Sequence, residues 1–352
     1  MTRPRSSRVV SGATERDSRR HIPVLLSEVI ESLAPKDGDL IIDGTFGAGG
    51  YTSAILDTAD CRVLALDRDP RAVRDGAALI ARYEGRLTLV EAPFSEMADI
   101  AAETFGAGLS QPGGPLVDAV VLDIGVSSMQ LDEAERGFSF QNDGPLDMRM
   151  SAQGESAADF LNTADEEDIA NVIYVYGEER RSRAIARAIV RERAQKPFSR
   201  TLELADTVLR VFHGRKVDGR HPATRTFQAL RIYVNDELGE LARALSAAES
   251  ILKPEGRLAV VTFHSLEDRI VKKFFASRTG KEIGVSRHLP VQSIKSELPS
   301  FRFLNSRPLT PSKGELDLNP RARSARLRWA IRTGEPTHAL DLAALEVPSP
   351  AG

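Results

Sequence analysis

Four short apolar runs divide the first third of the chain, at residues 40–42, 62–66, 87–90 and 119–122. Runs without polar alternation predict strands that are buried on both faces of a sheet. Segments with helical periodicity separate the runs, and this alternation predicts a parallel, doubly wound α/β sheet. A fifth strand is expected at 257–262 and a last one at 325–331.

Helix signals flank these strands. The sequence predicts a helix that begins near Pro23 and carries Leu26 and Leu33 on one face. Pro70 is expected at the first position of a single helix that extends to about Tyr83.

About 130 residues separate the fourth and fifth strands, far more than a crossover between parallel strands needs. Helical patterns fill much of this interval, at 165–176, 178–194, 201–212 and 224–236. From Arg180 to Arg231 the chain has twelve Arg and two Lys against four acidic residues, a net charge of +10, whereas the whole chain carries −3. We therefore expect an inserted helical domain with a positive field that suits a polyanionic partner.

The number of cysteines and the composition of the terminal segments restrict which structural classes and cellular settings fit the sequence. One cysteine excludes an intramolecular disulfide framework and a cysteine-rich zinc site, and it fits a reducing, cytoplasmic setting. No metal-ligating constellation, membrane span or secretion signal is evident in the sequence. Residues 1–20 are expected to be a disordered basic tail, with a transit peptide as the alternative, and residues 334–352 a mobile tail.

Chemically useful residues follow the apolar runs. Asp43 and a glycine-rich turn come after the first, Asp67 after the second, Phe94 after the third and Asp123 after the fourth. Ligands of doubly wound sheets bind outside the carboxyl ends of the strands, so these residues are candidates for one site. For any single aspartate, a helix cap or a turn is an equal alternative.

Two cofactor classes use this architecture. A dinucleotide needs the spacing G-x-G-x-x-G, whereas the turn here has Gly44-x-x-Gly47-x-Gly49-Gly50. Asp43 would also repel a pyrophosphate but would tolerate the ammonium group of S-adenosylmethionine. Asp67 is placed to accept hydrogen bonds from ribose hydroxyls, and Phe94 offers an apolar wall for adenine. The pattern therefore favours S-adenosylmethionine.

Longer motifs resemble the family of ribosomal RNA small subunit methyltransferase H. The match covers almost everything from His21 to Arg332, and its motifs lie at 21–26, 43–50, 66–70, 122–128, 136–140, 143–150, 221–231 and 262–269. The resemblance implies a class I S-adenosylmethionine-dependent methyltransferase fold, formed by residues 21–136 and 237–333, with an inserted basic RNA-recognition domain at 137–236. It also implies N4-methylation of one cytidine, position 1402 by the ribosomal RNA convention, in the P-site region of 16S rRNA in the small ribosomal subunit.

Carried over by position, the family's cofactor contacts fall on Gly49, Gly50, Tyr51, Asp67, Phe94, Asp123 and Gln130. Three positions depart from the family's usual residues: Tyr51 replaces His, Ile124 replaces Leu and Met129 replaces Pro. The backbone of Tyr51 can still donate its N–H to a ligand, so the departure there concerns only the role of the usual imidazole.

Methylation of an amine requires an acceptor for its N–H bonds rather than a covalent nucleophile. Asp123, Ser127 and Ser128 are candidates for this acceptor, although the two hydroxyls are equally suited to capping the next turn. His264 is a second-rank candidate, with a structural role as the alternative. Methylation of a ring carbon would need a cysteine, and Cys61 lies near the amino end of its strand, on the wrong side of the sheet.

Several residues are candidates for contact with RNA. Phe138 and Phe140 are placed to stack a flipped cytosine, with core packing as the alternative for at least one of them. We expect two groups of basic residues to contact the RNA phosphates. Arg180, Arg187 and Arg191 recur at helical spacing, and Arg215, Lys216 and Arg220 cluster in a loop.

Three other functions compete with this interpretation. The protein could instead methylate a DNA amine or a protein. It could be a nicotinamide dehydrogenase, or a non-catalytic assembly factor of the small ribosomal subunit.

Overall fold

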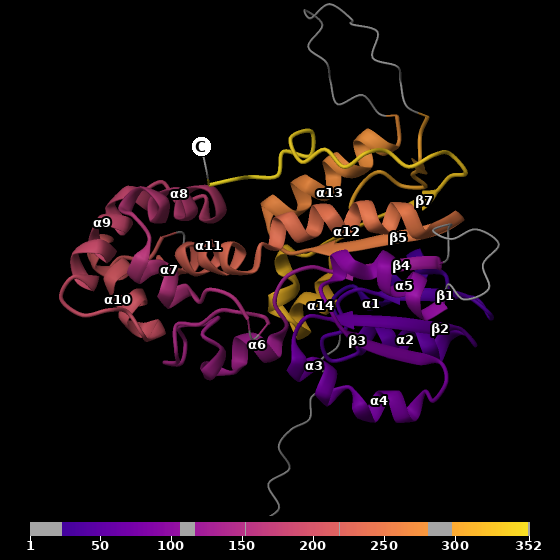
Figure 1. Ribbon diagram of the computed structural model, residues 1–352, viewed down its shortest axis with the longest axis horizontal. Helices are drawn as coiled ribbons and strands as arrows, with labels where there is room; N and C mark the ends of the chain where they lie inside the picture. The colour runs from indigo at the N-terminus through magenta and orange to yellow at the C-terminus, as the bar shows by residue number, and fades with distance from the viewer. Residues whose placement is uncertain (1–22, 106–116, 152, 218, 281–297, 351–352) are drawn as a thin grey trace, which may run out of the picture.

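The computed structural model describes residues 23–105, 117–151, 153–217, 219–280 and 298–350. At its centre is a seven-stranded sheet with the order β3-β2-β1-β4-β5-β7-β6 (Figure 1). The first five strands in this order pair in parallel, whereas β7 is antiparallel to both of its neighbours. The α/β class I fold expected from the sequence is confirmed. The strands are β1 (Leu40–Asp43), β2 (Arg62–Asp67), β3 (Leu87–Glu91), β4 (Val117–Asp123), β5 (Leu252–Thr262), β6 (Phe301–Arg302) and β7 (Arg326–Arg332).

Helices cover the sheet and form a second lobe beside it, made by α7 to α11 (Figure 1). Those of the sheet region are α1 (Leu26–Leu33), α2 (Gly50–Thr58), α3 (Pro70–Asp75), α4 (Ala77–Arg82), α5 (Met97–Phe105), α12 (Glu237–Ile251), α13 (Ser265–Arg278) and α14 (Lys313–Leu318). Those between β4 and α12 are α6 (Ser128–Asp132), α7 (Ala157–Thr163), α8 (Glu166–Gly177), α9 (Ser182–Arg193), α10 (Thr201–Val211) and α11 (Ala223–Asn235). None of the helices in the described ranges is long and apolar enough to cross a membrane.

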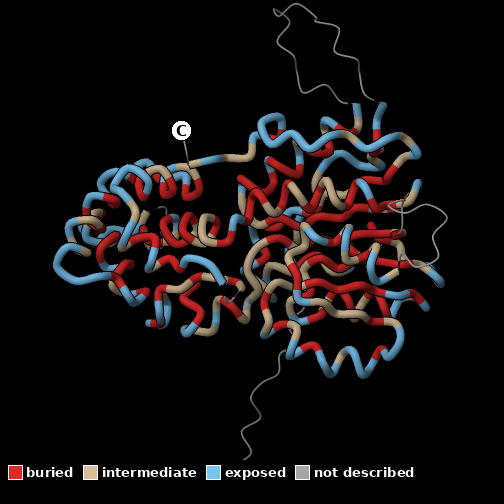
Figure 2. Tube along the Cα trace, in the orientation of Figure 1, coloured by how far each residue is buried: buried red, intermediate tan, exposed pale blue. Residues whose placement is uncertain are grey.

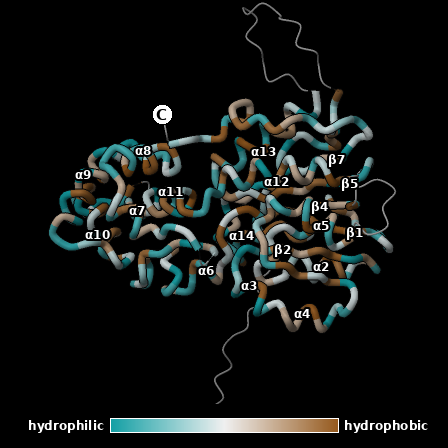
Figure 3. The backbone as a smooth tube through the Cα atoms, in the orientation of Figure 1, coloured by the Kyte–Doolittle hydropathy of each residue, from teal (hydrophilic) through white to brown (hydrophobic). Residues whose placement is uncertain are grey.

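The central strands are buried on both faces, which is why their sequences are continuous apolar runs (Figures 2 and 3). Successive residues of a strand point to opposite faces. Accordingly Leu40 and Ile42 join one hydrophobic cluster, whereas Ile41 joins the other. The first cluster continues into the insertion, where it includes Ile173 and Leu230. The second lobe therefore shares a core with one face of the sheet.

Three local predictions need correction. The helix expected from Pro70 to Tyr83 is broken at Gly76, where an added Cβ would lie 2.4 Å from Cδ2 of Leu89. Gly76 lies against Leu89 of β3, a contact that the local sequence does not reveal and that leaves no room for a side chain. The first helix begins at Leu26 rather than near Pro23. Strand β5 begins five residues before the expected start, and α12 precedes it in a region for which no helix was predicted.

The carboxyl-terminal segment was expected to be mobile from residue 334 onward, but its described part packs against the protein. Leu345 is buried, with 1% of its surface exposed, and Glu346 forms an ion pair with Lys273 of α13. The Tyr176 hydroxyl donates a hydrogen bond to the carbonyl of Pro348 at 3.4 Å. The segment thus passes from the sheet to the insertion, as the yellow trace in Figure 1 shows. The predicted basic tail, residues 1–20, lies outside the described residues.

A buried ion pair joins α12, α13 and this segment. Glu249 is fully buried and accepts hydrogen bonds from Nε of Arg278 at 3.1 Å and from Oγ of Ser300 at 2.6 Å. The backbone N–H of His338 donates to the same carboxylate at 3.2 Å. Loss of the carboxylate would leave a buried guanidinium without its counter-charge.

We predict that Glu249→Ala lowers the free energy of unfolding by about 3–5 kcal/mol, because breaking one side of a buried pair leaves the other charge uncompensated. Urea denaturation followed by circular dichroism measures the change. As a control, Asp75→Ala removes the exposed ion pair with Arg74 and should leave the denaturation midpoint unchanged. Equal midpoints for the two variants would contradict the prediction.

Candidate functional site

A pocket of about 450 Å³ lies where the loops after β1, β2 and β4 meet. Of the seven residues predicted to bind the cofactor, six line it: Gly50, Tyr51, Asp67, Phe94, Asp123 and Gln130. Gly49 does not line the pocket. It precedes α2 with a φ of +74°, and an added Cβ there would lie 2.3 Å from Cδ1 of Leu79. Glycine is thus required at this position for backbone conformation and packing.

Asp43 differs from its predicted role, because its side chain faces the protein rather than the pocket. The carboxylate is fully buried and accepts hydrogen bonds from the backbone N–H of Thr45 at 3.1 Å and from Oγ1 of Thr52 at 2.7 Å. Burial raises the pKa of Asp43 above its ordinary value. Asp43 therefore fixes the glycine turn to α2 instead of contacting a ligand directly.

Asp67 connects the glycine turn to the end of β2. One carboxylate oxygen accepts the backbone N–H of Gly47 and the other that of Asp69, both at 2.8 Å. Burial raises the pKa of Asp67 to about 6 despite these two hydrogen bonds. Each carboxylate oxygen has a further lone pair, so Asp67 can still accept hydrogen bonds from two hydroxyl groups of a ligand.

Asp123 has an unpaired oxygen. Its backbone N–H donates to Oγ1 of Thr45 at 2.7 Å, but its buried Oδ1 has no hydrogen-bond partner among the described residues. Burial raises the pKa of Asp123 well above its ordinary value, and the nearby Asp43 and Glu267 raise it further. A buried acceptor without a partner is costly, which points to a ligand that donates to it.

The hydroxyl of Ser127 is already engaged as a helix cap. Ser127 Oγ accepts the N–H of Gln130 at 3.2 Å, and Gln130 Oε1 accepts the N–H of Ser127 at 3.1 Å. The Gln130 amide also donates to Asp69 at 3.0 Å. These bonds show Ser127 and Gln130 fixing α6 at the rim of the pocket. The side chain of Ser128 lies outside the part of the chain that the structure describes.

Among the described residues, five arginines line the pocket, none of them predicted as a site residue, and Arg136 and Arg231 among them are held by carboxylates. Arg136 is buried against Asp69, with 2.5 Å between Nη1 and Oδ2, and its Nη2 donates to two backbone carbonyls after α6. Arg231 donates through Nε and Nη2 to the two oxygens of Glu237, at 2.7 and 2.8 Å. Both arginines belong to the resemblance motifs, but only the fold shows that they reach this pocket.

The two predicted stacking aromatics pack elsewhere. Phe138 is 5% exposed in the core, and Phe140 contacts His221 and Phe227 with ring centroids 4.8 Å apart in each pair. Neither lines the pocket. Phe263, directly after β5, does line it and is only partly buried. The sequence analysis did not name Phe263 as a site residue.

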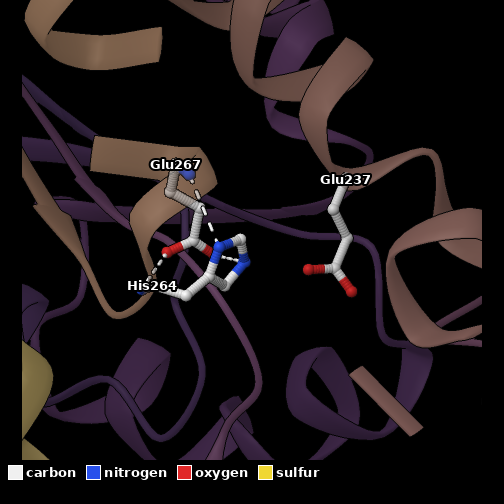
Figure 4. A group of neighbouring side chains, drawn as sticks. All are labelled: Glu237, His264 and Glu267. Atoms are coloured by element: carbon white, nitrogen blue, oxygen red, sulfur yellow. Dashed lines mark hydrogen bonds and ion pairs between the residues drawn. The ribbon is translucent and has the colours of Figure 1, made fainter. Parts of the chain in front are cut away.

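His264 lies outside the pocket lining and caps α13 (Figure 4). Its Nδ1 accepts the N–H of Glu267 at 3.5 Å, and its Nε2 lies 2.8 Å from Oε1 of the same side chain. Burial tends to raise the pKa of Glu267, but His264 and Arg231 outweigh it and hold that pKa below its ordinary value.

Glu237, His264 and Glu267 have possible metal-ligating atoms within 4.8 Å of one another (Figure 4). Both oxygens of Glu237 already accept hydrogen bonds from Arg231, however, and Glu267 faces the imidazole. Protein groups thus already occupy the carboxylates, with Arg231 on Glu237 and the imidazole of His264 beside Glu267. We interpret the group as a charge network between the insertion and the sheet rather than as a metal centre.

The residues present fit S-adenosylmethionine, the cofactor expected from the sequence. Asp67 would accept the ribose hydroxyls, Phe94 would cover the adenine, and the loop at Gly47 and Gly50 would take the methionine end. Asp123 offers its unpaired oxygen nearby. Tyr51 would contribute its backbone N–H, because its hydroxyl already donates to the carbonyl of Val24.

We predict that the affinity for the cofactor weakens as the pH is lowered, because Asp67 becomes protonated. The carboxylate, which accepts ribose hydroxyls, predominates above its pKa of about 6. Affinity should therefore be constant near neutral pH and roughly tenfold weaker one pH unit below this pKa. Isothermal titration calorimetry between pH 5 and pH 8 measures the change.

Asp67→Asn is the matched control. It should bind more weakly at neutral pH and lose the decline on acidification, because the amide does not titrate. If the variant retained the decline, another group would be responsible for it.

Comparison with known proteins identifies relatives along almost the whole chain. The chain is 58% identical over 325 residues to a protein of Parvibaculum lavamentivorans named ribosomal RNA small subunit methyltransferase H, covering 92% of this chain and 93% of that one. A protein of the same name from Rhodopseudomonas palustris is 57% identical (91% and 93% covered), and one from Methylorubrum populi 52% identical (99% and 98% covered). The model of the MraW methylase family matches residues 18–333, and the chain belongs to this family.

Proposed function

We propose that this protein transfers a methyl group from S-adenosylmethionine to the exocyclic N4 of one cytidine in the P-site region of 16S rRNA. Membership of a methylase family supports methyl transfer, and the names of the relatives support small-subunit ribosomal RNA as the substrate. The N4 position and the particular cytidine follow from the sequence resemblance. The cytoplasm, where ribosomal subunits mature, is the proposed location.

The unpaired oxygen of Asp123 is the observation that carries the proposal. An exocyclic amine donates two N–H bonds and needs an acceptor as its nitrogen becomes tetrahedral. The Oδ1 atom is buried and lacks a partner among the described residues, and its residue lines the pocket that fits the cofactor. The raised pKa of Asp123 also suits a group that takes up a proton from the methylated amine.

S-adenosylmethionine, when bound, supplies a methyl group on a positively charged sulfur. The protein supplies position and acceptors. Asp123 accepts an amine N–H, while the backbone bond to Thr45 keeps the end of β4 beside the glycine turn. Ile124 and Phe263 provide apolar lining that excludes water from the reacting groups. Ser127 remains a candidate second acceptor, since a hydroxyl oxygen has two lone pairs.

The position of Cys61 supports amine rather than carbon methylation. Methylation at C5 of a pyrimidine proceeds through a cysteine nucleophile. The chain has one cysteine, and its Sγ is buried and donates to the carbonyl of Ile55 at 3.7 Å, just before β2. Cys61 is not among the residues that line the pocket at the opposite ends of the strands.

We predict that Asp123→Ala lowers kcat by roughly 10²–10³-fold at saturating cofactor, a typical cost of removing one well-placed polar contact to the transition state. A radiolabelled methyl transfer assay on small ribosomal subunits measures it. Asp67→Asn is the matched control: it should raise the KM for the cofactor and retain most of kcat. An unchanged kcat in Asp123→Ala would remove Asp123 from the chemistry.

Mapping of methylated nucleosides tests the function itself. Small-subunit RNA from cells that lack the protein should lose one N4-methylcytidine, and the purified protein should restore it. We expect assembled subunits to be better substrates than free RNA, because the target region is formed by folded RNA. Methylation of DNA or protein instead, or retention of the N4-methylcytidine without the protein, would contradict the proposal.

A further inference from the structure

A second hollow, of about 970 Å³, lies between the insertion and the sheet region. The insertion contributes Gly177 and the segment from Arg220 to Gln228, whereas the sheet region contributes the start of α13 and the segment before β7. Phe263 lines both this hollow and the cofactor pocket. The two cavities therefore meet at a partly exposed aromatic ring.

The lining of this hollow is basic. Its six cationic side chains outnumber its three carboxylates, giving an excess of three positive charges; the cations are Arg220, Arg225, Arg269, Lys272, Arg323 and Arg326. Protein groups already bind all three carboxylates. Asp268 pairs with Arg326 and Arg328, Glu179 with Arg225, and Glu178 with Arg269.

Three of the cations have no ion pair within the described ranges: Arg220, Lys272 and Arg323. All three are exposed. They come from three separate parts of the chain: the loop before α11, the middle of α13, and the 3₁₀-helix η3 (Pro320–Ser324). The fold has thus gathered unneutralised positive charge around one hollow.

Two helices also begin at this hollow. Thr224 lies in the first turn of α11 and Ser265 at the first position of α13, and both residues line it. The positive ends of these helix dipoles add to the field of the cations and favour phosphate groups.

By contrast, two arginines of α9 lie near carboxylates. Arg187 lies 3.7 Å from Glu166, and Arg191 lies 3.8 Å from Glu192. This helix was expected from the sequence to contact RNA. Its face is the less suitable of the two for a polyanion, because carboxylates lie beside its charges.

We propose that the hollow binds the single-stranded RNA segment next to the target nucleotide, and that this nucleotide enters the cofactor pocket across Phe263. The inference rests on the proposed function and adds to it the path of the strand. A base that undergoes chemistry must leave its stack, so the adjoining backbone needs a single-strand path with cations for its phosphates. Lys272 and Arg323 extend that path onto the methyltransferase domain, beyond the insertion.

The test compares two double variants. Lys272→Ala with Arg323→Ala removes two unpaired cations of the hollow, and Arg187→Ala with Arg191→Ala removes two cations of α9. Binding of small ribosomal subunits is measured by filter binding over a range of salt concentrations, together with KM and kcat for methyl transfer. Calorimetry with S-adenosylmethionine confirms that each variant keeps a folded cofactor site.

The hollow variant should bind about tenfold more weakly, and the slope of log affinity against log salt should fall by about 1.4, for two phosphate contacts to a single strand. Its kcat and cofactor affinity should be unchanged, and the α9 variant should resemble the wild type. Wild-type affinity in the hollow variant, or a larger loss in the α9 variant, would overturn the inference.

Filter binding measures RNA binding without catalysis. The proposed role of the hollow can therefore be tested separately from the proposed methylation activity. If the wild type binds subunits but makes no N4-methylcytidine, the proposed function fails while the comparison of the variants still tests the hollow. If the variants fold poorly, Lys272→Gln with Arg323→Gln keeps the side-chain packing and removes the same charges.

Discussion

Buried negative charge at the ends of adjacent parallel strands is the constraint on which the site depends. Two of the three carboxylates are used in folding: Asp43 holds the glycine turn to α2, and Asp67 accepts backbone N–H groups of that turn and of the segment after β2. Asp123 keeps one oxygen without a partner among the described residues. The first two carboxylates thus shape the loop, while the third is left for a ligand that donates hydrogen bonds.

The insertion completes this site instead of standing apart from it. Arg136, directly before the insertion, pairs with Asp69, and Arg231, near the end of the insertion, lines the same pocket. The side-chain amide of Asn235 donates to the carbonyl of Met148, while its own carbonyl oxygen accepts the N–H of Met150. Because the hydrophobic cluster also continues from the sheet into the insertion, displacement of the inserted lobe would disturb the cofactor pocket.

The sequence predicted the strands and their terminal carboxylates well, because an apolar run that ends in aspartate is a local signal. It failed where the cause was distant in sequence. Leu89 of β3 leaves no room for a side chain at Gly76. The segment around Leu345 is tied to α13 and α8 through Glu346 and Pro348. Likewise Arg231 and Phe263 reach the pocket only after the chain has folded back across the sheet. Periodicity and spacing report local geometry, and neither reports such contacts.

Charge balance links the chemistry to this arrangement. In the proposed reaction, methyl transfer would remove a positive charge from the donor and create one on the amine, so the positive charge would stay beside Asp123 until a proton leaves. Burial, Asp43 and Glu267 all raise the pKa of Asp123, which makes its carboxylate a better proton acceptor. Its protonation would also relieve the repulsion among these three carboxylates. The buried negative charge at this position would therefore favour both the binding of a cationic methyl donor and the removal of the proton that the proposed reaction releases.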